Sequence, residues 1–387
     1  MAPIYLDYNA TTPIDPEVFR AMLPYLGDLD NNHRGIFGNP SSTHALGRAA
    51  HDAVDHSRAQ VAALLGAQPD EILFTGGGTE ASNHAIKGVF FARQTGNFLT
   101  RLFRRAGCHV ITSAIEHPAT TNPINFLQSL GCRVTVVGVN GVGRVDPDDV
   151  RRAIAPDTVL ISVMHSNNEV GTLQPIAELG KIARERGVLM HTDVAQSLGK
   201  VSVNVDDLHV DLVTVAGHKL YAPKGIGVLY VRRGVKLVPL LHGAGHENGQ
   251  RAGTENVPTI VALGKACEIA RATLPQATVR LTALRDRLHH HLAGRVTLNG
   301  CPTNRLPNTL NVNFTGHIGA ELLAKVPGVA ASTGSACHEG RVTQSAVLCA
   351  MRVPPEVGKG AVRLTVGRFS TEAEIDSAAK QLLAAAG

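Results

Sequence analysis

Lys219 and Asp193 have the clearest capacity for chemistry, and each ends an apolar stretch typical of a buried strand. Because ligands of α/β proteins bind at the carboxyl ends of parallel strands, we expect the two side chains to lie together. A lysine amine attacks an aldehyde once burial has lowered its pKa, and an aspartate can keep a pyridine nitrogen protonated. Taken singly, Lys219 is more typical of a surface lysine, and Asp193 is more typical of a helix cap. As a pair they favour chemistry on a pyridine aldehyde.

A glycine-rich turn, TGGGTE at residues 75–80, lies between a predicted strand and a predicted helix. Backbone N–H groups of such a turn, with the helix N-terminus, bind phosphate without a cationic side chain. The turn matches neither the dinucleotide-binding nor the P-loop pattern, and turns of this kind are also common without a ligand. Combined with Lys219, it indicates a phosphorylated cofactor that is not a nucleotide.

Two further polar residues follow predicted strands at the same edge of the sheet. His117, after the strand at 109–112, can stack on a cofactor ring and move protons near neutral pH. It is also typical of a histidine that only begins a helix. Asn168, after the strand at 159–164, is likewise open to a functional and a purely structural interpretation.

Cys337 lies among small residues, in ASTGSACHEG at 331–340. Buried structural cysteines usually sit in apolar runs, as we expect for Cys349 in VLCAM at 347–351. A thiol in a flexible stretch beside His338 therefore suggests a reactive group.

The composition narrows the class of protein. The chain has 387 residues, 44% hydrophobic and 18% charged, which is typical of a globular enzyme with about two domains. Its formal charge of +5 is dispersed, so we expect no nucleic-acid surface, and no apolar run approaches the roughly 18 residues that cross a membrane. Six cysteines without a CxxC pair or Cys/His ligand spacing predict neither disulfides nor a metal site, and a reducing cytoplasm fits best.

Apolar runs predict the strands that position these residues, at 71–75, 109–112, 133–137, 159–164, 188–191, 212–216 and 227–231. Helical patterns occur at 47–65, from 79, and at 176–186, where Gly187 ends the helix. This alternation favours an α/β fold with a mostly parallel sheet covered on both faces. Residues 90–106, with their basic cluster, are expected to form a polar insertion.

The pattern changes after about residue 256. A long helix at 257–293, strands at 309–314 and 362–366, and a helix from Thr371 predict a smaller α+β domain. We expect residues 16–258 to form the large domain, and 1–15 together with 259–387 the small one.

These motifs together resemble the cysteine desulfurases, a branch of the fold-type I pyridoxal-phosphate enzymes in the class V aminotransferase superfamily. The resemblance extends over nearly the whole chain. Its motifs are YLDYNATTP at 5–13, GNPSS at 38–42, GGTE at 77–80, EH at 116–117, NNE at 167–169, DVAQ at 193–196, GHK at 217–219, RAGT at 251–254, GSAC at 334–337 and RLTVGR at 363–368.

The resemblance implies a role for each matched site residue. Lys219 would bind the cofactor aldehyde, Asp193 the pyridine nitrogen, and His117 the face of the ring. The phosphate would be bound by Gly78, Thr79, His218 and, from the neighbouring subunit of a homodimer, Thr254. The groups nearest the phenolic oxygen and the substrate would be Gln196, Asn168 and, for the substrate carboxylate, Arg363.

The implied reaction converts L-cysteine to L-alanine and leaves a persulfide on Cys337 for a sulfur-acceptor protein, as in iron–sulfur cluster assembly. Selenocysteine lyases are an alternative because they share the Cys337-His338 pair. They also tend to have no serine where this chain has Ala216. A sulfur carrier that keeps only the fold would bind no cofactor, and an aminotransferase or kynureninase would not need the GSAC motif.

Overall fold

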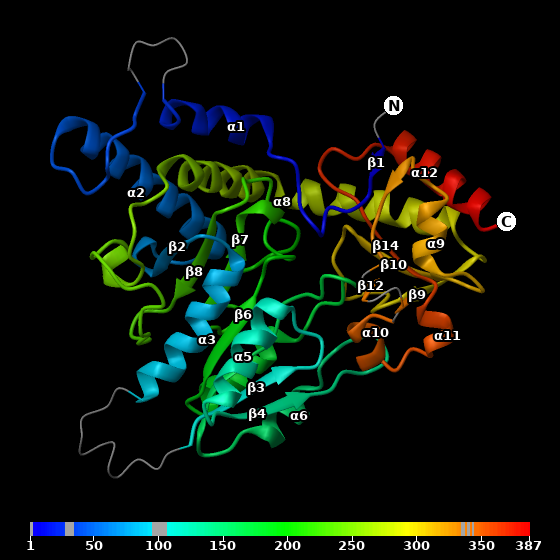
Figure 1. Cartoon of the computed structure of the whole chain (residues 1–387), viewed down its shortest axis with the longest axis horizontal. Helices are drawn as coiled ribbons and strands as arrows, with labels where there is room; N and C mark the ends of the chain where they lie inside the picture. The colour runs from blue at the N-terminus through cyan, green and yellow to red at the C-terminus, as the bar shows by residue number, and fades with distance from the viewer. Residues whose placement is uncertain (1–2, 28–34, 95–106, 334–336, 339–340, 343) are drawn as a thin grey trace.

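The computed structural model describes residues 3–27, 35–94, 107–333, 337–338, 341–342 and 344–387, with the backbone alone described at 337–338 and 341–342. Seven strands in this part of the chain form the central sheet, in the order β2-β8-β7-β6-β5-β3-β4 (Figure 1). Only β8 runs antiparallel to its neighbours. The strands are β2 (Ile72–Thr75), β8 (Gly227–Val231), β7 (Leu212–Ala216), β6 (Leu189–Asp193), β5 (Thr158–Ser162), β3 (His109–Ser113) and β4 (Arg133–Val137).

Helices cover both faces of this sheet, which explains why its strands are apolar runs without alternation. On one face lie α3 (Gly78–Gln94) and α5 (Pro118–Ser129), whose apolar side chains form a core with alternate strand residues. The core of the other face includes α1 (Pro16–Met22), α2 (Ala45–Leu65), α6 (Pro147–Ala153), α7 (Ile176–Glu185) and the first half of α8 (Val257–His291). The described 3-10 turns are η1 (Leu23–Tyr25), η2 (Pro69–Glu71), η3 (Gly217–Lys219) and η4 (Glu247–Gly249).

A second, antiparallel sheet, β14-β10-β9, has its own core. It comprises β14 (Ala361–Thr365), β10 (Thr309–Phe314) and β9 (Val296–Asn299), with α9 (Gly319–Ala324) and α12 (Glu372–Ala385). Helix α8 belongs to both cores: Ile260 packs in the first and Leu284 in the second. The predicted division at residue 258 stays a prediction.

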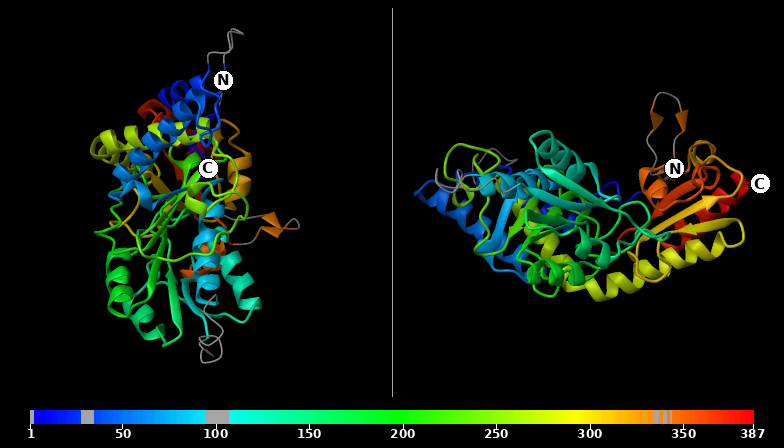
Figure 2. Two further views of the ribbon diagram at one scale, coloured as in Figure 1. Left: turned by 90° about the vertical axis from the view of Figure 1, so that its left-hand side faces the viewer. Right: turned by 90° about the horizontal axis from the view of Figure 1, so that it is seen from below.

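The first strand of the chain pairs with one near its other end. β1 (Ile4–Tyr5) runs parallel to β11 (Val329–Ala330). Beyond β11, β12 (Cys337–His338) pairs with β13 (Arg341–Val342), and these two short strands project from the body of the protein (Figure 2). The helices α10 (Ala346–Ala350) and α11 (Pro355–Gly358) follow.

Most predicted elements are present, and four strands have the predicted bounds. Others are displaced by one or two residues; β6, for example, continues to Asp193 itself. Two expectations were wrong. Residues 90–94 belong to α3 rather than to an insertion, and 95–106 lie outside the described residues. Cys349 is exposed, because α10 is short and turns Val347 and Leu348 inward instead.

Buried neutral histidines give the fold a predictable acid sensitivity. His191 is fully buried in β6, where its ring bonds to Ser162 at 2.8 Å and to Thr214 at 3.0 Å. Burial lowers its pKa to about 3. Because the unfolded side chain titrates near pH 6.5, unfolding takes up a proton below that pH, so stability is full above it and is lost towards pH 3.

When the pH falls from 8 to 5, we therefore expect the unfolding free energy of the wild type to decrease by about 2 kcal/mol more than that of His191→Gln. Urea unfolding of the purified protein at both pH values measures this loss. The substitution also removes the two hydrogen bonds of the imidazole ring, so we expect the variant to be less stable than the wild type already at pH 8. The exposed His290→Gln is the control, and an equal loss in His191→Gln and wild type would show that His191 is not the titrating group.

Candidate active site

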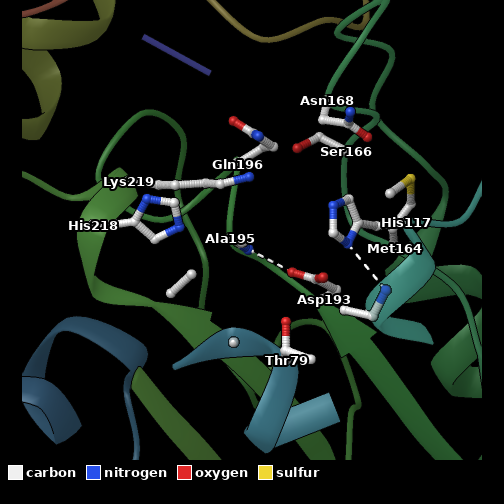
Figure 3. Close-up of a pocket in the computed structure, with 13 residues that line it drawn as sticks. Thr79, His117, Met164, Ser166, Asn168, Asp193, Ala195, Gln196, His218 and Lys219 are labelled. Atoms are coloured by element: carbon white, nitrogen blue, oxygen red, sulfur yellow. Dashed lines mark hydrogen bonds between the residues drawn. The ribbon is translucent and has the colours of Figure 1, made fainter. Parts of the chain in front are cut away.

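One pocket at the carboxyl ends of the central strands contains eight of the eleven predicted site residues. Figure 3 shows Lys219, His218 and Gln196 on one side of it, His117 and Asn168 opposite, and Asp193 with Thr79 between them. The predicted residues in its lining are Gly78, Thr79, His117, Asn168, Asp193, Gln196, His218 and Lys219. The same strand-end geometry that predicted their proximity brings them together.

Lys219 is the last residue of η3, directly after β7. A segment more than 200 residues earlier holds this turn: the amide and the hydroxyl of Thr12 donate to His218 O at 2.9 and 3.0 Å. Tyr221 follows with a φ of 65°, a left-handed conformation in which its amide donates to Thr12 Oγ1 at 2.9 Å. Burial lowers the pKa of Lys219, while the Asp193 carboxylate opposes that shift. The site therefore favours a neutral, nucleophilic amine more than water does.

Asp193 ends β6, next to β7 in the sheet. Its Oδ1 accepts from Ala195 N at 2.8 Å. Residues 195–200 form turns, so the helix-cap reading of Asp193 was wrong. Burial raises its pKa, opposed by the Ala195 bond and by Lys219. A half-buried carboxylate with one bonded oxygen suits a positively charged N–H partner.

His117 both begins a helix and lines the pocket. It is the N-cap of α5, where its Nδ1 accepts from Ala119 N at 3.1 Å. An accepting Nδ1 places the ring proton of the neutral form on Nε2. Burial and then the Lys219 charge lower the pKa of His117, which favours that neutral form. His117 thus begins a helix, as one interpretation of its sequence context held, and it also lines the pocket. Its stacking on a cofactor ring stays a prediction.

The N-terminus of α3 forms another wall through Gly78 and Thr79. First-turn amides of a helix have no intrahelical acceptor and favour an anion. Gly77, at the entry, has a φ of 148°, which only glycine adopts without strain. His218 faces the same region, and burial lowers its pKa to about 4, so it offers a neutral ring. This end of the pocket fits a phosphate.

Asn9 joins the two sides of the pocket. Its backbone carbonyl accepts from Gln196 Nε2 at 3.0 Å, and its side-chain Nδ2 donates to Asn168 O at 3.1 Å. The Oε1 of Gln196 is buried, with no hydrogen-bond partner among the described residues. A buried acceptor of this kind is costly unless a ligand supplies a donor.

Three predicted site residues are not part of the described lining. Arg363, in β14, is buried, and its Nη2 pairs with Asp7 Oδ1 at 2.7 Å while Nη1 donates to Asn168 O at 3.1 Å. Thr254 is exposed and does not line the pocket within this single chain. Cys337 lies in β12, and its side chain is outside the described residues.

Sequence reasoning did not predict five residues of the pocket lining, namely Ala119, Met164, Ser166, Ala195 and Ala216. Ser166 lies two residues before Asn168, so the rule that strand ends carry site residues could have found it. Its hydroxyl bonds to Ser197 at 2.6 Å. No local sequence pattern predicts that the alanines line the pocket.

No metal-binding group of three or more His, Cys, Asp or Glu side chains occurs within the described residues. In the same part of the chain, no helix has the length and apolar character needed to span a membrane.

Fold and site together define a class V aminotransferase, and the family model for aminotransferase class-V matches residues 4–377. A cysteine desulfurase IscS from Dictyoglomus turgidum is 45% identical over 378 residues, which are 96% of this chain and 92% of that protein. One from Methanosarcina thermophila is 45% identical, over 96% of this chain and 89% of its own. The chain belongs to the cysteine desulfurase family.

Solved structures agree with this assignment. A NifS-like protein superimposes with a TM-score of 0.87 at 33% identity, covering 98% of each chain. A structure described as SspA in complex with cysteine gives a TM-score of 0.81 at 36% identity, covering 95% of this chain and 99% of that one. The expected fold-type I architecture, a mostly parallel sheet with helices, is confirmed.

Proposed function

We propose that this protein is a pyridoxal-phosphate-dependent cysteine desulfurase that converts L-cysteine to L-alanine and leaves the sulfur on Cys337. The observation that carries the proposal is that Lys219 and Asp193, each half-buried, line one pocket together with Gly78 and Thr79 at the N-terminus of α3. Relatives of matching length carry this activity in their names, and one solved relative is described as holding cysteine.

The donor set of the pocket fits this cofactor. Asp193 has an oxygen available for a pyridinium N–H, and the amides at Gly78 and Thr79 suit the phosphate. The unpartnered Oε1 of Gln196 needs a polar neighbour that the described residues do not supply. When bound, pyridoxal phosphate supplies an aldehyde for amines and a ring that accepts electrons. We assign His117 to the ring face and His218 to the phosphate.

Lys219 supplies the amine that holds the cofactor and then moves the substrate Cα proton. Both tasks need a neutral amine, which burial favours by lowering the pKa of Lys219. His117, with its proton on Nε2, covers the opposite side of the pocket from Lys219 (Figure 3).

Arg363 and Asn168 form the proposed substrate side. The guanidinium already bonds to Asp7 and to Asn168 O, so its orientation is set before substrate binds. A substrate carboxylate would accept hydrogen bonds from the N–H groups of Arg363 that are still free. One of these is Nε, which is buried and has no partner among the described residues. This arrangement favours an α-amino acid.

The sulfur step uses Cys337. Its thiolate attacks the sulfur of the bound cysteine, an S–S bond forms, and the C–S bond to the substrate Cβ breaks. The carbon takes a proton and leaves as alanine, so cysteine plus thiol gives alanine plus persulfide without an external oxidant. We propose that a sulfur-acceptor protein then receives this sulfur. We also propose a homodimer, in which the exposed Thr254 reaches the partner's phosphate site.

Incubation of the holoenzyme with L-cysteine tests the function. We expect free alanine in the supernatant and a gain of about 32 Da, one sulfur atom, on the peptide that contains Cys337. Dithiothreitol should remove the added mass and release sulfide. A preparation that forms alanine without this adduct would refute the persulfide step, and one that forms no alanine would refute the activity.

A further inference from the structure

The Cys337 segment, residues 333–344, lies between two described residues, Ser332 and Ser345. Each of them is bonded to a direct neighbour of Asn168, which lines the pocket. Ser332, before the segment, bridges β14: Arg363 N donates to Ser332 O at 2.6 Å, and Ser332 N donates to Arg363 O at 3.3 Å. Ser345, after the segment, donates its hydroxyl to Oε2 of Glu169. The segment is therefore tied at one end to the strand of Arg363 and at the other to the loop after β5.

These two attachment points belong to one hydrogen-bonded frame. Arg363 Nη1 donates to Asn168 O at 3.1 Å, one residue before Glu169. The backbone of Glu169 is held on both sides: its amide donates to Asn167 Oδ1 at 2.9 Å, and its carbonyl accepts from Asn311 Nδ2 at 3.1 Å. The carboxyl of Glu169 thus projects from a backbone that cannot shift independently of Asn168.

Ser345 is a well-defined partner for this carboxyl. It is buried, and its Oγ accepts from Val347 N at 3.1 Å and Leu348 N at 3.4 Å as the N-cap of α10. Its lone pairs are thereby engaged, and the hydroxyl proton is left for Glu169. Burial raises the pKa of Glu169, opposed by the Ser345 bond and by Arg363. Both the ionised and the protonated carboxyl can accept this hydroxyl, so the bond persists in either form.

We propose that Glu169 is a positioning residue for sulfur transfer, which through Ser345 fixes one end of the Cys337 segment to the loop that presents Asn168 to the substrate. The proposal rests on the proposed desulfurase function. Displacement of a reacting atom by about 1 Å can cost on the order of 100-fold in rate. Loss of the Glu169–Ser345 bond therefore slows persulfide formation, whereas cysteine binding, which uses Arg363 and Asn168, is retained.

Four variants of the holoenzyme test this role. Glu169→Ala removes the acceptor and Ser345→Ala the donor, whereas Glu169→Gln keeps an amide oxygen that can accept the same hydroxyl. Glu356→Ala, an exposed glutamate of α11, is the matched control. Quenched-flow mass spectrometry measures the rate of the 32 Da gain on Cys337, and titration of the cofactor absorbance measures cysteine affinity.

We expect Glu169→Ala and Ser345→Ala each to slow persulfide formation about tenfold with cysteine affinity within about twofold of wild type. The double variant should be no slower than either single variant, because both remove one bond. Glu169→Gln should restore the rate to within about twofold. Hydrogen exchange of the apoenzyme gives an independent readout: the amides of Val347 and Leu348 should exchange faster in Glu169→Ala but not in Glu356→Ala.

Unchanged persulfide rates in both alanine variants overturn the proposal. A loss of cysteine affinity equal to the loss of rate would also overturn it, because Glu169 would then be a substrate ligand. A Glu169→Gln variant as slow as Glu169→Ala would overturn it as well, because the role of Glu169 would then be merely structural. If Glu169→Ala does not fold, Ser345→Ala alone decides. Absence of persulfide in the wild type would instead refute the proposed function, so the two proposals can fail separately.

Discussion

Lys219→Ala is expected to lower alanine formation from cysteine by at least about a thousandfold, the scale at which losing a covalent catalyst usually acts. The pocket brings no second lysine to its lining among the described residues. The variant should therefore lose both the amine that holds the cofactor and the group that moves the Cα proton. Its purified form should lose the yellow colour of lysine-bound pyridoxal phosphate even after incubation with excess cofactor.

Lys224→Ala, five residues further along the chain and exposed, is the matched control and should keep both colour and activity. Absorbance spectra and an alanine assay on the same preparations make the comparison. Retention of the wild-type absorbance band in Lys219→Ala would show that the cofactor is not bound to this lysine. Full turnover in Lys219→Ala would refute the assignment, and a colourless, inactive wild type would favour a carrier that keeps only the fold.

Cys337→Ala is expected to abolish the persulfide and to reduce alanine formation from cysteine to background, because no other thiol takes its place. The described free cysteines 108, 132, 267 and 301 are buried, and 349 is the exposed one. Cys349→Ala is therefore the control, and it should desulfurate cysteine at the wild-type rate. The same mass spectra and alanine assay report both variants.

Selenocysteine separates the desulfurase from the lyase. A desulfurase uses cysteine efficiently in the wild type, whereas a selenocysteine lyase prefers selenocysteine by a large factor and releases selenium without a persulfide. Retained selenocysteine turnover in Cys337→Ala fits both enzymes, so the ratio of kcat/KM for the two amino acids in the wild type decides. A strong preference for selenocysteine would overturn the function proposed here.

Local patterns predicted the sheet well because most of its strands are short apolar runs bounded by turn residues. Leu212–Ala216 and Gly227–Val231 are buried along nearly their whole length, and their bounds coincide with the prediction. Cys349 shows where such reasoning fails. An apolar run of five residues fits a buried strand or a short helix, and α10 is a helix that exposes every third or fourth side chain.

The pocket was predictable to the extent that strand ends converge. Asp193 ends β6, whereas Lys219 and His117 follow β7 and β3, so a parallel sheet places all three at one edge. The contacts of Asn9 and Thr12 were not predictable from pattern. Those that reach the pocket and the turn of Lys219 join residues 159 to 209 positions apart, and nothing near either partner indicates the other.

Those same N-terminal contacts determine when the enzyme can become competent during synthesis. Thr12 holds the turn of Lys219, yet the strand preceding it, β1, has its partner at Val329. A ribosome releases the chain from its N-terminus, so the first segment made must wait for residues near 330 before it can pair. The long-range pairing is also slow to form, because the loop it closes spans most of the chain. Cofactor capture is thus expected as a late event, after translation has passed β11.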